Sequence, residues 1–239
     1  MELPPLLCND APMLQRINDA CCNTWIGRSI NRIVTMFELA VIRYYHDKKT
    51  TGLLKEIIYE DKPFILKPSE VFLLYSFAQN QLAIDGAYAE VGVFKGTTAK
   101  AICEGKEERD LYLFDTFEGL PEIGEVDRKF KTKMFRSNEQ RVREKLAKYP
   151  NVHICKGMFP ATGSSVQGKK FAFVHLDTDI YQSTKDCLEF FYGRMSKGGI
   201  IISHDYHAQG VRKAFDEFFR GKPERVIQLP MSQCMITKR

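Results

Sequence analysis

The chain has 239 residues, of which 44% are hydrophobic and 27% are charged, a balance that is ordinary for a globular protein, does not indicate disorder and suits one α/β domain with a helical addition. The formal net charge of +5 is too small to indicate a nucleic-acid-binding protein, and without a long apolar run we expect neither a signal peptide nor a membrane-spanning segment. The seven cysteines are irregularly spaced without a Cys-x-x-Cys pair, which predicts reduced thiols in a cytoplasmic protein.

Residues 1–66 are expected to form an N-terminal helical extension. Apolar residues between Ile30 and Tyr45 recur at the i, i+3, i+4 and i+7 spacing of a helix face, and Met36 and Leu39 add apolar surface beside it. A helix that is apolar around most of its girth needs cover on two sides. One cover would be the main domain, and the other a second subunit of a homodimer or higher homo-oligomer, unless the helix acts as a lid over a pocket. Burial of the helix within its own domain is the alternative.

Residues 67–239 are expected to form one domain in which strands and helices alternate. Lys67-Pro68-Ser69-Glu70 has the residue types of a helix start. The expected strands are short apolar runs at residues 88–91, 111–114, 152–154, 171–176, 200–202, 226–229 and 234–237. The expected helices after the first strand cover residues 97–103, 137–149, 182–195 and 209–219. This alternation predicts a mostly parallel sheet with helices on both faces, closed by an antiparallel hairpin of the last two strands.

Three connecting segments carry local signals of their own. Residues 118–136 show no periodicity and contain five basic residues, which predicts a long loop that closes over an acidic substrate or is simply solvated. The capping box Ser137-x-x-Gln140 predicts the start of the following helix. The pair Gly198-Gly199 is expected to separate a helix from the next buried strand.

The turn after the first strand carries the motif Glu90-x-Gly92-x-x-x-Gly96. Glycine lets a ligand approach the backbone there, and the following helix offers free N–H groups. The spacing differs from the Gly-x-Gly-x-x-Gly motif that cradles the pyrophosphate of a nicotinamide cofactor. S-adenosylmethionine has no phosphate and carries an amino-acid end, so an acidic residue in this turn is tolerable. The motif therefore favours S-adenosylmethionine over a dinucleotide.

Asp115 stands at the end of the second strand. An acidic side chain at that place can accept hydrogen bonds from the hydroxyls of a ribose, since ligands of open α/β sheets bind outside the carboxyl ends of the strands. A helix or loop cap is the alternative role. Combined with the glycine turn, the position favours ribose binding.

Further acidic residues follow two later strands. Asp177 and Asp179 follow one buried strand, and His204 and Asp205 follow the next. Carboxylates that face one point repel one another unless they are protonated or bridged by a cation. Oxygen ligands suit Mg²⁺, Ca²⁺ or Mn²⁺, whereas the imidazole of His204 favours a transition metal or no metal. Capping of the following helices is the alternative role for the aspartates.

Five segments stand in order along the chain: Glu90-x-Gly-x-x-x-Gly96, Phe114-Asp-Thr-Phe-Glu-Gly-Leu-Pro121, Lys156-Gly-Met-Phe159, His175-Leu-Asp-Thr-Asp-Ile-Tyr181 and Gly198-Gly-Ile-Ile-Ile-Ser-His-Asp-Tyr206. Together they resemble the macrocin O-methyltransferase family, which includes sugar O-methyltransferases of antibiotic pathways. The resemblance covers roughly residues 85–220. It implies a Rossmann-like class I methyltransferase fold: a mostly parallel seven-stranded sheet with a C-terminal antiparallel hairpin and helices on both faces, here preceded by the N-terminal helical extension.

The resemblance also implies S-adenosylmethionine as cofactor and a divalent cation, Mg²⁺ or another. In the family, the aspartate that matches Asp177 binds the metal beside the accepting hydroxyl, and two successive acidic residues complete the site. Asp205 matches the second of these, and His204 stands where the first is expected. The predicted metal ligands are therefore Asp177, His204 and Asp205. The predicted cofactor-binding residues are Glu90, Gly92, Phe94, Thr98, Asp115, Thr116, Phe117, Gly157 and Asp177.

These predictions describe an enzyme that moves a methyl group from S-adenosylmethionine to a hydroxyl of a small molecule, most simply a sugar or glycosylated natural product. An alcohol has a high pKa, so a metal or a positioned base is needed. Asp177 is the first candidate, and His204 and His207 are alternative bases or plain loop residues. The acceptor can be anionic, with no nucleic acid and no membrane involved. A phenol or catechol O-methyltransferase and a catalytically inactive binding protein of the same fold are the alternatives.

Overall fold

The computed structural model describes the backbone of residues 25–60 and 66–239, with side chains from residue 29 onward. The chain forms two compact units, residues 1–69 and 70–239, whose boundary lies close to the one expected after residue 66. The prediction of no signal peptide, and the adjacent Cys21 and Cys22, lie outside the described residues.

The first unit contains two described helices, α2 (Trp25–Tyr45) and α3 (Lys48–Glu60). The apolar face predicted from Ile30 to Tyr45 forms on α2, and its large side chains are exposed. Helix α3 lies within the expected helical extension, although the sequence analysis set no bounds for it. It begins at an aspartate cap, since the carboxylate of Asp47 accepts hydrogen bonds from the backbone N–H and the hydroxyl of Thr50.

The second unit is built on one sheet whose strand order is β3-β2-β1-β4-β5-β7-β6. The strands are β1 (Ala87–Val91), β2 (Leu111–Asp115), β3 (Val152–Lys156), β4 (Phe171–Leu176), β5 (Met195–Ser203), β6 (Ile227–Gln228) and β7 (Cys234–Thr237). The first five pair in parallel and β7 pairs antiparallel with both β5 and β6. This sheet confirms the predicted fold class, including the terminal hairpin.

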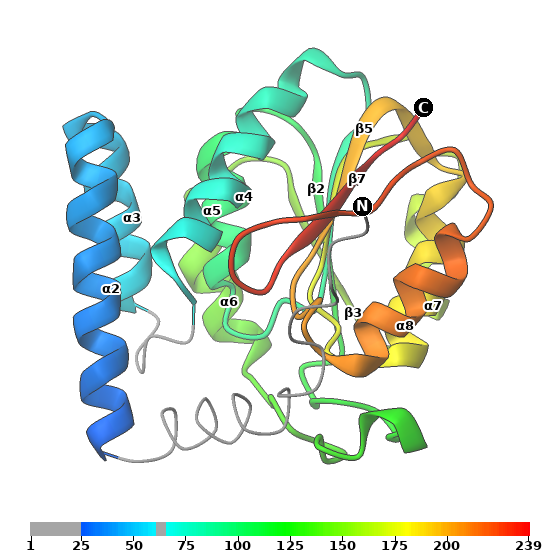
Figure 1. Ribbon diagram of the computed structural model, residues 1–239. Coiled ribbons are helices and arrows are strands. Elements are labelled where there is room, and N and C mark those ends of the chain that lie inside the picture. Colours follow the sequence, from blue (N-terminus) through cyan, green and yellow to red (C-terminus); the bar gives the residue numbers. More distant parts are fainter. Residues whose placement is uncertain (1–24, 61–65) are drawn as a thin grey trace, which may run out of the picture. The chain divides into compact units, whose positions relative to one another are not determined.

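Helices cover both faces of the sheet (Figure 1). Helices α5 and α6 lie on one face and α7 and α8 on the other; the helices of this region are α4 (Pro68–Asn80), α5 (Thr97–Gly105), α6 (Glu139–Leu146), α7 (Tyr181–Tyr192) and α8 (Gln209–Phe219). The central strands β1 and β4 are buried at every residue, as parallel strands covered on two sides must be. The core is therefore centred on the strands whose carboxyl ends carry the predicted site.

Two boundaries differ from the sequence prediction. Strand β5 begins at Met195 and runs through Gly198-Gly199 instead of starting after them, so the predicted helix end at residue 195 is wrong. Parallel pairing with β4 carries the strand through the glycines, with a register shift at this point. The cap of α6 is Asn138, whose side chain accepts a hydrogen bond from the N–H of Arg141, so the predicted Ser137 cap is one residue too early.

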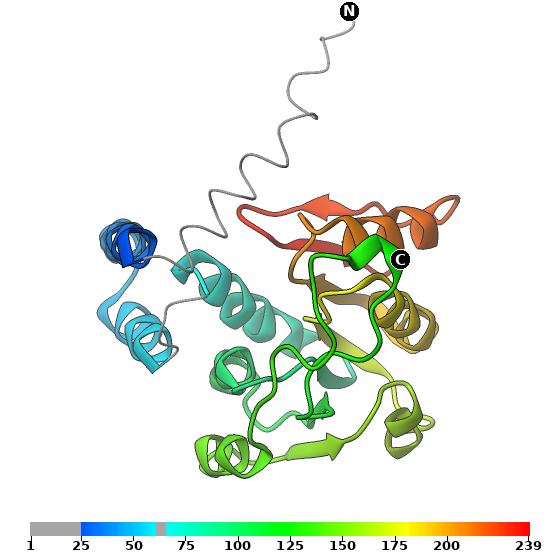
Figure 2. The same ribbon diagram turned by 90° about the horizontal axis from the view of Figure 1, so that it is seen from below.

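The long loop 118–136 forms as predicted between β2 and α6 and contains a single short 3-10 turn (Glu125–Asp127). The buried carboxylate of Asp127 accepts a hydrogen bond of 2.8 Å from the N–H of Tyr181 at the start of α7. The loop therefore reaches from β2 to the opposite side of the sheet, as the green segment of Figure 2 shows. Asp127 thus caps the start of α7. The sequence had left this role open for Asp177 and Asp179.

Two further predictions from the sequence concern membrane-spanning segments and disulfide bonds. No helix in the described ranges has the length and apolarity that crossing a membrane requires. Four cysteines in the described part of the chain, namely Cys103, Cys155, Cys187 and Cys234, are free thiols.

Candidate functional site

The ends of five parallel strands form one continuous rim. After four of these strands, namely β3, β1, β4 and β5, a backbone N–H donates to a carbonyl near the end of the adjacent strand. These bonds are Gly157 N–H to Asp115 O, Gly92 N–H to Phe114 O, Asp177 N–H to Val91 O and His204 N–H to Leu176 O, at 2.8 to 2.9 Å. The rim holds the residues after β3, β2, β1, β4 and β5 in a fixed row, at the edge of the sheet where open α/β proteins bind ligands.

Gly92 lies against the backbone of Asp177. A Cβ atom at Gly92 would stand 1.9 Å from the carbonyl oxygen of Asp177, and the glycine has φ of +88°. A side chain at this position is therefore excluded both by contact and by backbone conformation. The glycine that the sequence assigns to cofactor approach also sets the spacing between the β1 and β4 ends of the rim.

Asp115 organises two turns through its carboxylate. Oδ2 accepts hydrogen bonds of 2.7 Å from the N–H groups of Val93 and Phe94, and Oδ1 accepts one of 2.6 Å from the N–H of Phe117. A carboxylate offers about four acceptor positions, so these bonds leave about one for a ligand. The loop-capping role is present in the structure, and the ribose contact stays a prediction.

Glu90 lies beneath the rim and pairs with a neighbouring strand. Its Oε1 is 2.7 Å from Nδ1 of His175, its register partner on β4, and both side chains are fully buried. Burial raises the pKa of Glu90 to about 8 and lowers the pKa of His175 to about 4. Burial therefore favours the uncharged forms of both side chains, and Glu90 is not an exposed anion.

The other predicted cofactor-binding residues lie in the loops that follow the strands, apart from Thr98 in the first turn of α5. Phe94 has φ of +49° and its ring meets that of Phe135 edge-on. The hydroxyl of Thr116 donates to the carbonyl of Gly119 at 3.1 Å, and Phe117 is buried with φ of +58°. Thr98 is buried on α5, and Gly157 has φ of +136°.

The predicted metal ligands come together. Nδ1 of His204 lies 3.5 Å from Oδ1 of Asp177 and 3.3 Å from Oδ2 of Asp205. One ligand atom from each of these residues falls within 4.8 Å of the others. Asp205 has φ of +55°, a left-handed backbone conformation. An imidazole with two carboxylates is a donor set that fits a divalent transition ion better than Mg²⁺.

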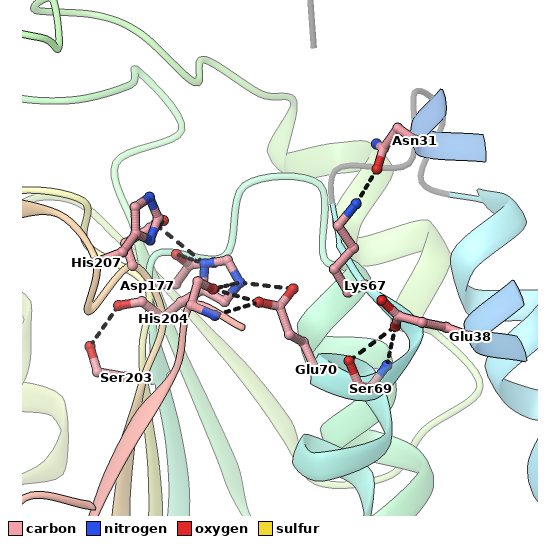
Figure 3. A network of polar contacts seen from close by, with 11 residues as sticks. Asn31, Glu38, Lys67, Ser69, Glu70, Asp177, Ser203, His204 and His207 are labelled. Atoms are coloured by element: carbon pink, nitrogen blue, oxygen red, sulfur yellow. Dashed lines mark hydrogen bonds and ion pairs between the residues drawn. The ribbon is translucent and has the colours of Figure 1, made fainter. Parts of the chain in front are cut away.

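Two residues around His204 were missed by the sequence analysis. Nε2 of His204 lies 3.1 Å from the hydroxyl of Ser232 and 3.4 Å from Oε2 of Glu70. The hydroxyl of Ser232 also donates to Oε1 of Glu70. Figure 3 shows His204 lying between Asp177 and Glu70. Glu70 was assigned only to a helix start and Ser232 only to a hairpin turn, and no local signal indicates their shared contact.

The charges in the cluster compensate one another. Burial lowers the pKa of His204, but the carboxylates of Asp177 and Asp205 outweigh burial and raise it well above its usual value. For Asp205, burial alone would raise the pKa. The His204 cation outweighs burial and holds the pKa of Asp205 well below its usual range. Burial raises the pKa of Asp177 to about 6 against the influence of His204. Without an ion, His204 is thus a cation that bridges two carboxylates.

Asp179 and His207 lie beside this cluster. Burial raises the pKa of Asp179 well above its usual value, and the negative charges of Asp205 and Asp177 add to that shift. Nδ1 of His207 is 3.8 Å from Oδ1 of Asp205, and burial lowers the pKa of His207. His207 is about half exposed, so it is the neutral imidazole of the site that remains open to solvent.

The sequence matches a known family and curated proteins. The model of the macrocin-O-methyltransferase (TylF) family matches residues 76–237. The chain is 30% identical over 156 residues to a rhamnosyl-tetracenomycin-C 4'-O-methyltransferase of Streptomyces olivaceus, covering 58% of this chain and 59% of that protein. It is 27% identical over 154 residues to the mycinamicin III 3''-O-methyltransferase of Micromonospora griseorubida, covering 56% and 61%. The chain thus spans less than two thirds of these relatives.

Solved structures share the fold at low sequence identity. The O-methyltransferase NovP has a TM-score of 0.65 at 20% identity, covering 72% of this chain and 80% of its own. The calicheamicin methyltransferase CalS11 has a TM-score of 0.61 at 15% identity, covering 99% and 94%. An O-methyltransferase of Bacillus cereus in complex with S-adenosylhomocysteine has a TM-score of 0.58 at 15% identity, covering 87% and 100%.

Proposed function

The chain belongs to the macrocin-O-methyltransferase (TylF) family, and from that premise we propose that it transfers the methyl group of S-adenosylmethionine to a hydroxyl of a small molecule. The observation that carries the proposal is the rim, which holds Gly92, Asp115, Asp177 and His204 in one row at the strand ends. The glycine turn and the Asp115 loops are suited to the cofactor, and the acidic cluster next to them is suited to the acceptor.

The proposed acceptor is a sugar or a glycosylated natural product. Two curated relatives are named for methylation of a rhamnosyl-tetracenomycin and of mycinamicin III. A phenol or catechol acceptor and a catalytically inactive protein of the same fold are the competing hypotheses, because His204 replaces an expected acidic residue. A cytoplasmic location of the protein is also part of the proposal. The free thiols of the described cysteines support it.

In the proposed reaction, Asp177 receives or directs the proton of the accepting hydroxyl. The methyl group on a sulfonium is already activated, so the protein must align the oxygen and deal with its proton. Asp177 is partly exposed, and burial raises the pKa of its carboxyl, which favours uptake of a proton. His204 holds Asp177 and Asp205 in place, and His207 is the alternative base.

Asp177, His204 and Asp205 would hold a divalent cation in this proposal. Their donor atoms are close enough to share one ion, and Glu70 and Ser232 at Nε2 would orient the imidazole. When bound, the cation supplies Lewis acidity that lowers the pKa of the accepting hydroxyl.

The test is transfer of labelled methyl from S-adenosylmethionine to a panel of glycosides and phenols, before and after chelation. We expect a labelled glycoside, a turnover lowered about tenfold or more by chelator, and better recovery with Mn²⁺ than with Mg²⁺ because of the imidazole ligand. Transfer to phenols alone would contradict the sugar acceptor. Turnover that chelator does not change would reject the proposed cation. His204 would then be an imidazolium that bridges Asp177 and Asp205.

We further propose that α2 pairs with a second copy of the chain. Eight large apolar residues of α2 are exposed, up to 82% for Tyr44. At roughly 200 Å² for a large side chain, they leave on the order of 1,000 Å² of mostly apolar surface, about what each partner contributes to a stable interface. A monomer seldom exposes a patch of this size.

Substitution of Phe37 and Val41 by glutamate tests this pairing. We expect a homodimer for the wild-type protein and a monomer for the double variant in light scattering, because the charges would have to be buried. The matched control is Arg32→Glu, which changes the charge of an exposed α2 residue away from the apolar face and should leave the dimer intact. A wild-type monomer would contradict the proposal.

A further inference from the structure

A groove of about 530 Å³ lies between the starts of α5 and α6. It is lined by Lys95, Arg136, Ser137, Asn138, Arg141, Val142 and Lys145. Four of these seven residues are cationic, and none of the lining residues that the structure describes is acidic. The groove borders the cofactor turn, because Lys95 directly follows Phe94, whose N–H binds Asp115.

The cations in the groove differ from the other cations of α6. Asn138, Arg141, Val142 and Lys145 are spaced as one helix face. On other faces, Arg143 pairs with Glu139 at 2.7 Å and Lys148, after the helix, pairs with Glu104 at 3.3 Å. Within the described part of the chain, no ion pair is made by Lys95, Arg136 or Arg141. Arg143 and Lys148 are thus paired outside the groove, whereas Lys95, Arg136 and Arg141 remain available to an anionic ligand.

Two further features of the groove suit an anion. The hydroxyl oxygen of Ser137 is buried and has no hydrogen-bond partner among the described residues, although a buried hydroxyl usually finds one. Helices α5 and α6 both begin here, and helix N-termini carry partial positive charge with free N–H groups. The lining of the groove thus combines cations, a serine with an unused hydroxyl and the first residues of α6, and the start of α5 lies close by.

We propose that this groove binds an oxyanion, a phosphoryl or carboxylate group, carried by the methyl acceptor. The proposal rests on the proposed function in taking the anion to be part of the acceptor. Arginine at 136 and 141 can bind two oxygens of such a group at once, and Lys95 adds a point charge. The acceptor would then be an acidic or phosphorylated sugar whose anion lies beside the cofactor turn.

The test is calorimetric titration of the full chain with inorganic pyrophosphate. We expect one site that weakens about tenfold or more in Lys95→Gln/Arg141→Gln, since each lost charge-assisted contact is worth that much, and that weakens with added salt. The matched control is Arg143→Gln, two residues after Arg141 on another face of α6. This variant should bind pyrophosphate as the wild type does. All three substituted side chains are exposed, so the variants should fold.

Equal binding by the groove variant and the control would overturn the proposal, and so would an absence of binding. Displacement of pyrophosphate by S-adenosylhomocysteine would also overturn it, because the anion would then be the cofactor's own carboxylate. The titration needs no turnover. Pyrophosphate binding that is lost in the groove variant, in a protein that methylates nothing, would reject the proposed function and retain the anion site.

Discussion

Gly92→Ala is expected to destabilise the second unit by about 3 kcal/mol or more. A new methyl group would stand 1.9 Å from the carbonyl oxygen of Asp177, so β1 and β4 would have to separate at the rim, and overpacking of this kind costs about 1–3 kcal/mol. The φ of +88° adds about 1–2 kcal/mol for an alanine. Urea unfolding measures the loss.

Gly168→Ala separates these two contributions. Gly168 has φ of +79°, but a Cβ there would meet nothing within 4 Å. Its substitution should therefore cost only the backbone strain, about 1–2 kcal/mol. Equal losses for the two variants would show that the contact between Gly92 and Asp177 does not constrain the rim.

Asp177→Asn is expected to lower the methyl-transfer rate by roughly 10²- to 10⁴-fold, the usual contribution of a positioned acid or base. Asparagine keeps the shape of the side chain but loses the charge that faces His204 at 3.5 Å and cannot take up a proton. The fold of the rim should be unchanged, because the hydrogen bond from the N–H of residue 177 to the carbonyl of Val91 is retained. Single-turnover kinetics with labelled cofactor measure the rate.

The control for that loss is Asp186→Asn on the outer surface of α7. Asp186 accepts a hydrogen bond from Gln182 in an exposed pair and is not among the residues that face His204. Its variant should keep the full rate. If Asp177→Asn also kept it, the proton of the acceptor would have to be handled elsewhere, with His207 the next candidate.

Much of the fold could be predicted because parallel strands that are buried on both faces appear in the sequence as continuous apolar runs. Phe171–Leu176 is such a run and is fully buried in β4. The chemistry-bearing residues follow these runs directly, so the meeting of Asp177, His204 and Asp205 follows from topology. The terminal hairpin was predictable from its turn residues, and it supplied the feature that separates this sheet from a fully parallel one.

The remaining site depended on contacts between distant segments. Glu70 has the composition of a helix start, and nothing local indicates that its carboxylate meets His204 and Ser232. Asp115 is an equally good ribose ligand or loop cap by sequence, and only the three backbone bonds to its carboxylate show the capping role. Ser137 and Asn138 are adjacent residues that can both cap a helix, and only the hydrogen bond from Arg141 shows that Asn138 does so.

The most direct measurement is a calorimetric titration of the wild-type chain with S-adenosylhomocysteine and, separately, with NAD. If the loops after adjacent parallel strands have been shaped around a sulfonium nucleoside, the protein takes up one S-adenosylhomocysteine per chain and no NAD. Binding of NAD would contradict the proposed function. So would a folded protein that binds neither S-adenosylhomocysteine nor NAD.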